Sequence, residues 1–236
     1  MEVAPRIHQL WGLGCQVFAL VGDRVTLIDA GAPGNGRLVL RQLRSIGIQP
    51  EDVDRIVITH HHLDHRGAVN ELRRATGAQV SVHSSEAPFF RGEAPYPNPV
   101  NRERAPRLAA MTDALFAATR GRPIPVDDLE DGDSIDVLGG LQILHSPGHT
   151  RGSVVLWLPE QQLLFAGDAM GFRRDRLETP DPRVSEDAEL AKASLERLAG
   201  LEVETICFSH FRPLPSGARK ALEDLVGGWS AEFRAS

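Results

Sequence analysis

Four of the nine histidines of this chain fall within seven residues, in the segment Thr59-His60-His61-His62-Leu63-Asp64-His65. The run before it, Arg55 to Ile58, is short and rich in β-branched residues, which is typical of a buried strand. Side chains two residues apart point the same way where the chain is extended. His60 and His62 are therefore predicted to face one metal ion, and His61 to face elsewhere.

The end of the same segment offers a second set of ligands. Asp64 and His65 lie where the chain turns into the next helix, so they can face a second ion. Imidazole and carboxylate groups are ligands that zinc prefers, and they also suit iron or manganese. A histidine cluster alone would also describe a solvated surface loop, so the interpretation depends on the rest of the chain.

Further ligand types follow three later strands. His149, Asp168 and His210 each lie just beyond an apolar run that is predicted to be a strand. Three separate strand ends thus supply one ligand each. This pattern favours a metal site over a surface loop.

The order of these motifs resembles that of a known family. The runs T-H-H-H-L-D-H, S-P-G-H-T-R-G-S, F-A-G-D and F-S-H are similar to the ordered motifs of the metallo-β-lactamase-fold hydrolase superfamily, and the similarity covers essentially the whole chain. Ile28-Asp29-Ala30-Gly31 also matches the early aspartate turn of such proteins. The resemblance implies an α/β fold, a four-layer αβ/βα sandwich, with an inserted Pro-rich and helical segment.

The resemblance also implies a dinuclear site and its ligands. One ion would be bound by His60, His62 and His149, the other by Asp64, His65 and His210, and Asp168 would bridge the two. The cofactors would be two divalent ions, zinc first, with iron or manganese as alternatives. They would hold a bridging hydroxide that acts as the nucleophile, and Asp64 would help to orient it. The protein would then need no serine or cysteine nucleophile.

Other polar residues near the motifs have simpler interpretations. Asp29 is either an acceptor that orients histidine ligands from beneath or the aspartate of a turn that ends a strand. His145, His8 and His83 are predicted to be structural. Phe211 stands where many relatives have glycine, and its ring is predicted to narrow the site.

The residue at position 168 separates branches of the superfamily. Thiolate-using β-lactamases have cysteine there, and those with an all-histidine first site lack the bridging carboxylate. Asp168 therefore indicates the glyoxalase II or lactonase-like branch, not a true β-lactamase. Few residues follow His210, which weakens the assignment to glyoxalase II. The only tyrosine, Tyr96, does not lie shortly after His149, where lactonases usually have one, which weakens the assignment to lactonases.

The predicted activity is therefore metal-dependent hydrolysis of a small ester-like substrate, which would be a lactone, ester or thioester. A phosphodiester is the second choice, and oxidation of a persulfide by a single iron, as in dioxygenases of the same fold, is the third. A β-lactam comes last. A metal-free binding protein would have lost ligands, whereas all seven are present.

The chain is predicted to form one domain over residues 1–236, with an insertion over 84–125. Strands and helices alternate before the insertion, and short strands dominate after it. Helices are predicted over Leu38–Ile46, Gly67–Ala75, Asp187–Leu198 and Ser216–Trp229, the last with Ser216 as its cap. The insertion would be a lid or an interface with a second copy. Its apolar residues, which would line the pocket or pack the insertion on the body, are Phe89, Phe90, Tyr96, Met111, Leu115 and Phe116.

Composition limits the partners and the location. The net charge of −6 argues against nucleic acid held through its phosphates, so a small-molecule substrate is expected. The uncharged run Leu10 to Gly22 is shorter than the roughly 18 residues of a membrane span. The amino terminus has no basic segment leading into an apolar stretch, and Cys15 and Cys207 make no disulfide framework but are predicted to be small buried hydrophobes. A cytoplasmic location is expected.

Overall fold

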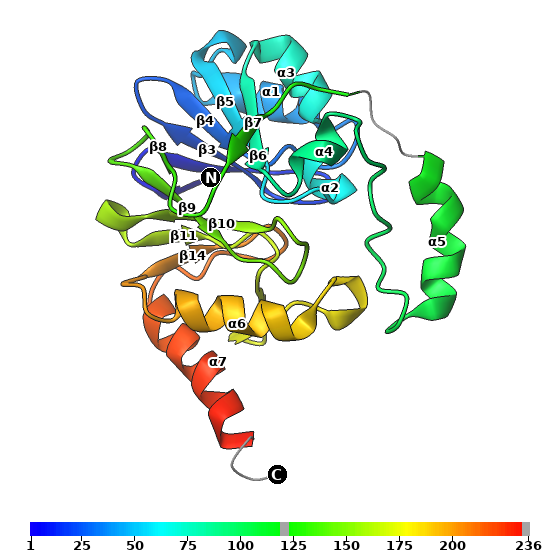
Figure 1. Ribbon diagram of the computed structural model, residues 1–236. Helices are drawn as coiled ribbons and strands as arrows, with labels where there is room; N and C mark the ends of the chain where they lie inside the picture. Colours follow the sequence, from blue (N-terminus) through cyan, green and yellow to red (C-terminus); the bar gives the residue numbers. More distant parts are fainter. Residues whose placement is uncertain (119–122, 233–236) are drawn as a thin grey trace.

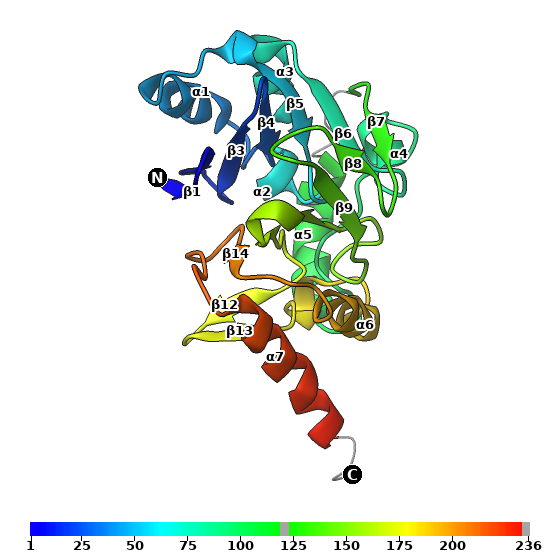
Figure 2. The same cartoon turned by 90° about the vertical axis from the view of Figure 1, so that its left-hand side faces the viewer.

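Two β-sheets lie face to face, and helices cover the outer face of each (Figure 1). The computed structural model describes residues 1–118 and 123–232, with the side chains of 1–113 and 123–228. Figure 2 shows the same order from the side, with α1 and α3 at one end of the molecule and α6 and α7 at the other. The predicted four-layer αβ/βα sandwich is confirmed.

The first sheet has seven strands in chain order, antiparallel from β1 to β4 and parallel from β4 to β7. Its strands are β1 (Glu2–Ala4), β2 (Ile7–Leu10), β3 (Val17–Val21), β4 (Val25–Ile28), β5 (Val53–Val57), β6 (Gln79–His83) and β7 (Asp127–Leu129). The helices of this half are α1 (Gly36–Ser45), α2 (Leu63–Arg66), α3 (Val69–Thr76), α4 (Ala87–Phe90) and α5 (Pro106–Ala118), with a 3₁₀ turn at Pro50–Asp52.

The second sheet has the order β14-β11-β10-β9-β8. A separate two-stranded ribbon, β12-β13, comes between β11 and β14 in the sequence. These strands are β8 (Ser134–Ile135), β9 (Leu141–His145), β10 (Val154–Leu158), β11 (Leu163–Phe165), β12 (Gly171–Arg173), β13 (Arg176–Glu178) and β14 (Thr205–Cys207). The helices are α6 (Ala188–Leu198) and α7 (Ala218–Glu232), with 3₁₀ turns at Pro159–Gln161 and Pro182–Val184.

Alternation along the strands builds three apolar layers from two sheets. In β10, Val154 and Leu156 face the layer between the sheets, whereas Val155 faces the layer under α6 and α7. In β3, Phe18 faces the same inner layer, where its ring lies 5.2 Å from that of Phe165. Burying both faces of a strand requires apolar residues at every position, which explains why these runs are continuously apolar.

Strand polarity gathers the polar loops at one edge of the sandwich. Because β4, β5 and β6 are parallel, the loops that follow them leave the same edge of the first sheet. In the second sheet β9, β11 and β14 share one direction, so their following loops also leave together. The two sets meet where Val154 N donates to Thr59 O at 3.0 Å and Gln16 N donates to Ser209 O at 2.7 Å. The topology therefore brings the predicted motifs to one place.

Several predicted boundaries change. The helix expected over Gly67–Ala75 is α3, which begins two residues later at Val69 and ends at Thr76, and the short helix α2 before it was not predicted. The last helix begins at Ala218, which places Gly217 and not Ser216 directly before it. Strands β1, β2, β7, β12 and β13 were not predicted. No helix within 1–118 and 123–232 is long and apolar enough to cross a membrane.

The inserted segment divides into a packed part and a projecting part. Phe89 and Phe90 of α4 are buried in the layer above the first sheet, and Tyr96 packs against it. Helix α5 lies to one side of the body (Figure 1), and Met111 on it is 79% exposed. Leu115 and Phe116 lie outside the described side chains. The aromatic residues that are described thus pack the insertion onto the body.

Candidate metal centre

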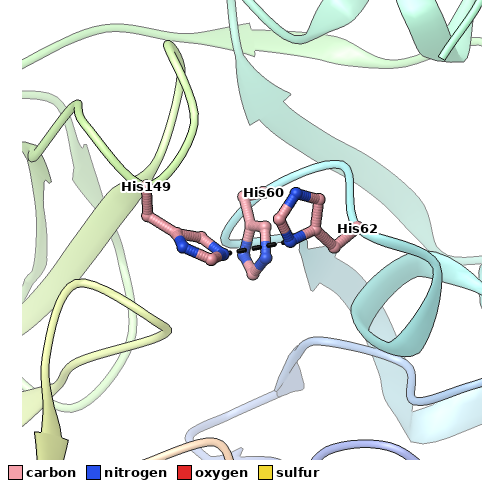
Figure 3. A group of neighbouring side chains, drawn as sticks. All are labelled: His60, His62 and His149. Carbon is pink, nitrogen blue, oxygen red and sulfur yellow. Dashed lines mark hydrogen bonds between the residues drawn. The ribbon is translucent and has the colours of Figure 1, made fainter. Parts of the chain in front are cut away.

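Three histidines from two loops form the most buried cluster of the site. His60 and His62 leave the end of β5, and His149 comes from the loop between β9 and β10 (Figure 3). One ring nitrogen from each lies within 4.8 Å of the others. His62 Nδ1 and His149 Nε2 are 3.0 Å apart. His60 Nε2 is buried and has no hydrogen-bond partner among the described residues.

A second cluster lies beside the first and is more open. It contains Asp64 and His65 from α2 and His210 from the loop after β14. The Nε2 atoms of His65 and His210 are 3.3 Å apart, and Asp64 Oδ2 is 3.5 Å from His210 Nε2. The Asp64 side chain is 42% exposed, whereas that of His65 is fully buried.

Asp168 lies between the two clusters. One carboxylate oxygen is 3.4 Å from His65 Nε2, and the other is 3.5 Å from His149 Nε2 and 3.2 Å from His210 Nε2. Its Oδ1 is buried without a hydrogen-bond partner in the described part of the chain. The structure therefore brings all seven predicted ligand residues together, with Asp168 between the two clusters.

The buried carboxylate of Asp29 lies beneath the loop that follows β5 and fixes the orientation of two histidines near it. Asp29, directly after β4, accepts hydrogen bonds from Thr59 N at 2.8 Å and from His65 Nδ1 at 2.8 Å. Thr59 Oγ1 donates to the same carboxylate and lies 3.1 Å from His60 Nδ1. The rings of His60 and His65 thus present their Nε2 atoms to the site. Of the two interpretations of Asp29, the acceptor that orients histidines from beneath their loop is confirmed.

His149 is oriented by the segment before α6. Its Nδ1 lies 3.3 Å from Ser185 Oγ, which itself donates to Asp181 O at 2.9 Å. Gly148 has φ +129°, and a Cβ there would lie 2.2 Å from Ala191 N at the start of α6. Only glycine allows this loop to approach the helix so closely.

The two clusters hold protons differently. Burial lowers the pKa of His60 and His62 well below the usual value and lowers that of His149 to about 4, so these rings are neutral at neutral pH. Burial also acts to lower the pKa of His65, but the neighbouring Cys15 sulfur and the Asp168 and Asp29 carboxylates raise it well above the usual value.

The pKa of the Asp168 carboxyl group shifts in the direction that keeps this group charged. Burial opposes ionisation of Asp168, yet the adjacent His65 and His210 hold its pKa well below the usual range. For His210, burial is outweighed by the hydrogen bond to Asp168, and its pKa is raised. The residues fit divalent metal, because His60 Nε2 and Asp168 Oδ1 are buried without a hydrogen-bond partner in the described part of the chain and the other ring nitrogens of the clusters converge on them.

A cavity of about 840 Å³ opens onto both clusters. Its wall is mainly apolar and comes from the β12-β13 ribbon, the segment that follows it and α7. Phe211 lines it, as expected for a ring that narrows the site. Pro99 is the insertion's contribution among the described lining residues, whereas Tyr96 stacks under the Arg66 guanidinium at 3.3 Å.

The remaining histidines and cysteines lie outside the clusters or beside them. His83 and His145 stack on each other with ring centroids 3.9 Å apart, away from the ligands. Cys15 and Cys207 are buried, and burial raises the pKa of their thiols to about 11 and about 12. Cys15 also lies within 4.8 Å of the ligand atoms of Asp29 and His65, a proximity the sequence did not indicate.

The chain belongs to the metallo-beta-lactamase superfamily, whose pattern matches residues 11–210. It is 29% identical over 205 residues to the probable metallo-hydrolase YflN of Bacillus subtilis (strain 168), covering 80% of this chain and 75% of that protein. It is 33% identical over 192 residues to a hydroxyacylglutathione hydrolase of Pseudomonas putida, covering 78% of this chain and 56% of that protein. A solved metallo-beta-lactamase family protein from Thermus thermophilus superposes with a TM-score of 0.72 at 25% identity, covering 99% of this chain and 82% of that one.

Proposed function

We propose that this protein is a dinuclear metallo-hydrolase that cleaves a small ester-like substrate. The observation that carries the proposal is the position of Asp168, within 3.5 Å of ring nitrogens from both histidine clusters. A carboxylate so placed is suited to bridge two divalent ions. Relatives named metallo-hydrolase and hydroxyacylglutathione hydrolase support hydrolysis as the reaction.

The proposed division of ligands follows the geometry. His60, His62 and His149 would hold the first ion, and Asp64, His65 and His210 the second. When bound, a pair of divalent cations lowers the pKa of water to near neutrality and polarises the bond that is cleaved. Asp64 faces the cavity beside this pair, so its exposed carboxylate would orient the attacking water.

The cavity favours a substrate with an uncharged, apolar part. Leu63, Met170, Leu177 and other apolar side chains form most of its described wall. Arg173 is the one arginine or lysine among its described lining residues, and its Nε is 3.9 Å from Glu178 Oε2. No arginine or lysine other than Arg173, which lies near Glu178, lines the described wall to hold the anionic group of a phosphodiester, and this supports lactones, esters and thioesters as the first substrates to test.

The experiment that tests the proposal combines metal analysis with a substrate panel. Protein purified without added metal is analysed for zinc, iron and manganese per chain. It is then assayed with an uncharged lactone, a thioester and a chromogenic bis-phosphodiester under matched metal loading. Two ions per chain with faster cleavage of the lactone or thioester support the proposal. One iron per chain with oxygen uptake, or faster cleavage of the phosphodiester, would overturn it.

A further inference from the structure

A glutamate at the start of the insertion is almost completely buried. Glu86 lies just after β6 and is 1% exposed. Its carboxylate accepts hydrogen bonds from His61 Nδ1 at 2.5 Å, from Thr150 Oγ1 at 2.6 Å and from Gly152 N at 3.1 Å. Three donors therefore hold one carboxylate in place, and the carboxylate in turn holds them.

The donors belong to the two loops that carry the first histidine cluster. His61 is the residue between His60 and His62, and Thr150 directly follows His149. Thr150 Oγ1 also lies 2.9 Å from Ser153 Oγ, which accepts from Thr150 N at 3.0 Å, so the turn after His149 is tied together internally. Glu86 is thus a direct link between a loop of the first sheet and a loop of the second.

The orientation of His61 depends on this contact. Its other ring nitrogen, Nε2, is buried and has no hydrogen-bond partner in the described part of the chain. On the main-chain side, Arg66 Nε donates to His61 O at 2.7 Å, and the Arg66 guanidinium lies over the Tyr96 ring of the insertion. The insertion therefore holds the His61 residue both at its ring, through Glu86, and at its peptide, through the Arg66 stack.

Burying a carboxylate is costly unless it is fully hydrogen-bonded, so this one has to have a compensating arrangement. Glu86 is not ion-paired with any described lysine or arginine within 4.0 Å, since Arg66 binds the His61 carbonyl instead. Burial acts to raise the pKa of Glu86, but the His61 ring and the two other donors outweigh it and hold the pKa below the usual range. The charged form is the one that the three donors select.

We propose that Glu86 is a positioning residue for the first metal ion, which it serves by fixing the His60 and His62 loop against the His149 loop. This inference rests on the proposed function, because it takes these three histidines as one ion's ligands. Glu86 is not among the described residues that line the cavity. Glu86 acts on the histidines through its contacts with His61 and Thr150, on the side of the site away from the cavity.

The test is Glu86→Gln, which keeps the shape and removes the charge. The matched control is Glu71→Gln on α3, where the side chain is 31% exposed and faces Arg37. Zinc is titrated into each metal-free protein in competition with a chromogenic chelator, and far-ultraviolet circular dichroism checks the fold. Loss of a residue that orients a ligand typically costs about 10- to 100-fold in metal affinity. We expect that loss for the first ion in Glu86→Gln and none in the control.

A purely structural role would give a different result. It would lower the melting temperature of Glu86→Gln and leave the affinities unchanged, or weaken both ions equally, and either outcome overturns the proposal. Thr150→Val removes one of the three contacts with little change of volume and decides the question if Glu86→Gln does not fold. First-ion affinity equal to that of the unaltered protein in Thr150→Val would then refute the link.

The two proposals fail in distinguishable ways. An unaltered protein that binds no divalent ion refutes the dinuclear hydrolase and the positioning role together. An unaltered protein that binds two ions but cleaves none of the substrates in the panel refutes ester hydrolysis alone. The first-ion affinity of Glu86→Gln, compared with that of the unaltered protein, then still decides the role of Glu86.

Discussion

Asp29 offers the sharpest quantitative test of the site, because one substitution of the same shape removes its charge and the acceptor oxygen that faces His65. Asp29→Asn keeps an oxygen that can accept from Thr59 N, but it removes the negative charge opposite His65 Nδ1. Asp29 has φ +61°, and asparagine is one of the residues that tolerate this conformation. The backbone should therefore stay in place.

The expected magnitude follows from the hydrogen bond that is lost. A hydrogen bond to a charged group contributes about 1.5 to 3 kcal/mol. At about 1.4 kcal/mol for each factor of ten, this corresponds to roughly 10- to 100-fold in the affinity of the second ion, which agrees with the usual effect of removing a residue that orients a histidine ligand. The first ion should be affected less, since His60 touches Asp29 only through Thr59.

The assay is a zinc titration of the metal-free protein against a chromogenic chelator, resolved into two binding steps. Asp23→Asn is the matched control, since Asp23 lies exposed in the turn between β3 and β4. A second-ion affinity in Asp29→Asn equal to that of the control would refute the argument that Asp29 holds His65 in its ligating orientation.

Three further outcomes are expected. His62→Ala and Asp168→Ala should each lose metal and hydrolysis with an unchanged far-ultraviolet circular dichroism spectrum, and full activity in either would contradict the ligand assignment. A metal ion binds neutral imidazole, and the pKa values of His65 and His210 are raised, so the affinity for the second ion should rise with pH until these raised pKa values are passed; calorimetry in buffers of different ionisation enthalpy can measure the protons released. Phe165→Ala, at a position 1% exposed between the sheets, should lower the free energy of unfolding in urea by about 3 to 5 kcal/mol, and a loss within error of zero would contradict the packing described for that layer.

The proposed ligand residues could be grouped from the sequence because each lies a few positions after a predicted strand. Leu163 to Phe165, the strand before Asp168, is continuously apolar, as a strand buried on both faces must be. The loops after strands of one direction leave the same edge of a sheet, so order along the chain was enough to group His149, Asp168 and His210.

The strands with weak sequence patterns were not predicted, because pairing and packing with residues distant in the sequence stabilise them. Strand β2, Ile7-His8-Gln9-Leu10, has two polar residues in the middle and is held in the sheet by pairing with β3. The β12-β13 ribbon contains arginine and glutamate around Phe172 and Leu177, which pack on the second sheet. In both cases distant packing decides the conformation, not intrinsic preference.

The residues that orient the ligands show the same limit. Asp29 meets Thr59 across 30 positions of the chain, so its role could not be chosen from its own neighbours. Glu86 was missed, although one signal was present: an acidic residue shortly after β6, the strand that is parallel to the one leading into the histidine segment. Ser185 gave no comparable signal, because it lies in an irregular segment before α6.

The distribution of the ligands along the chain bears on how the protein matures as it is synthesised. On the proposed assignment the first set is complete once His149 has been made, and Val154 can then pair with Thr59 to close the two sheets over it. The second set waits for His210, near the last strand. A chain that ended after β10 would contain the three histidines of the first set but neither Ser185, which contacts His149, nor Asp168, so the first set would be held as described only once the later half of the chain had been made.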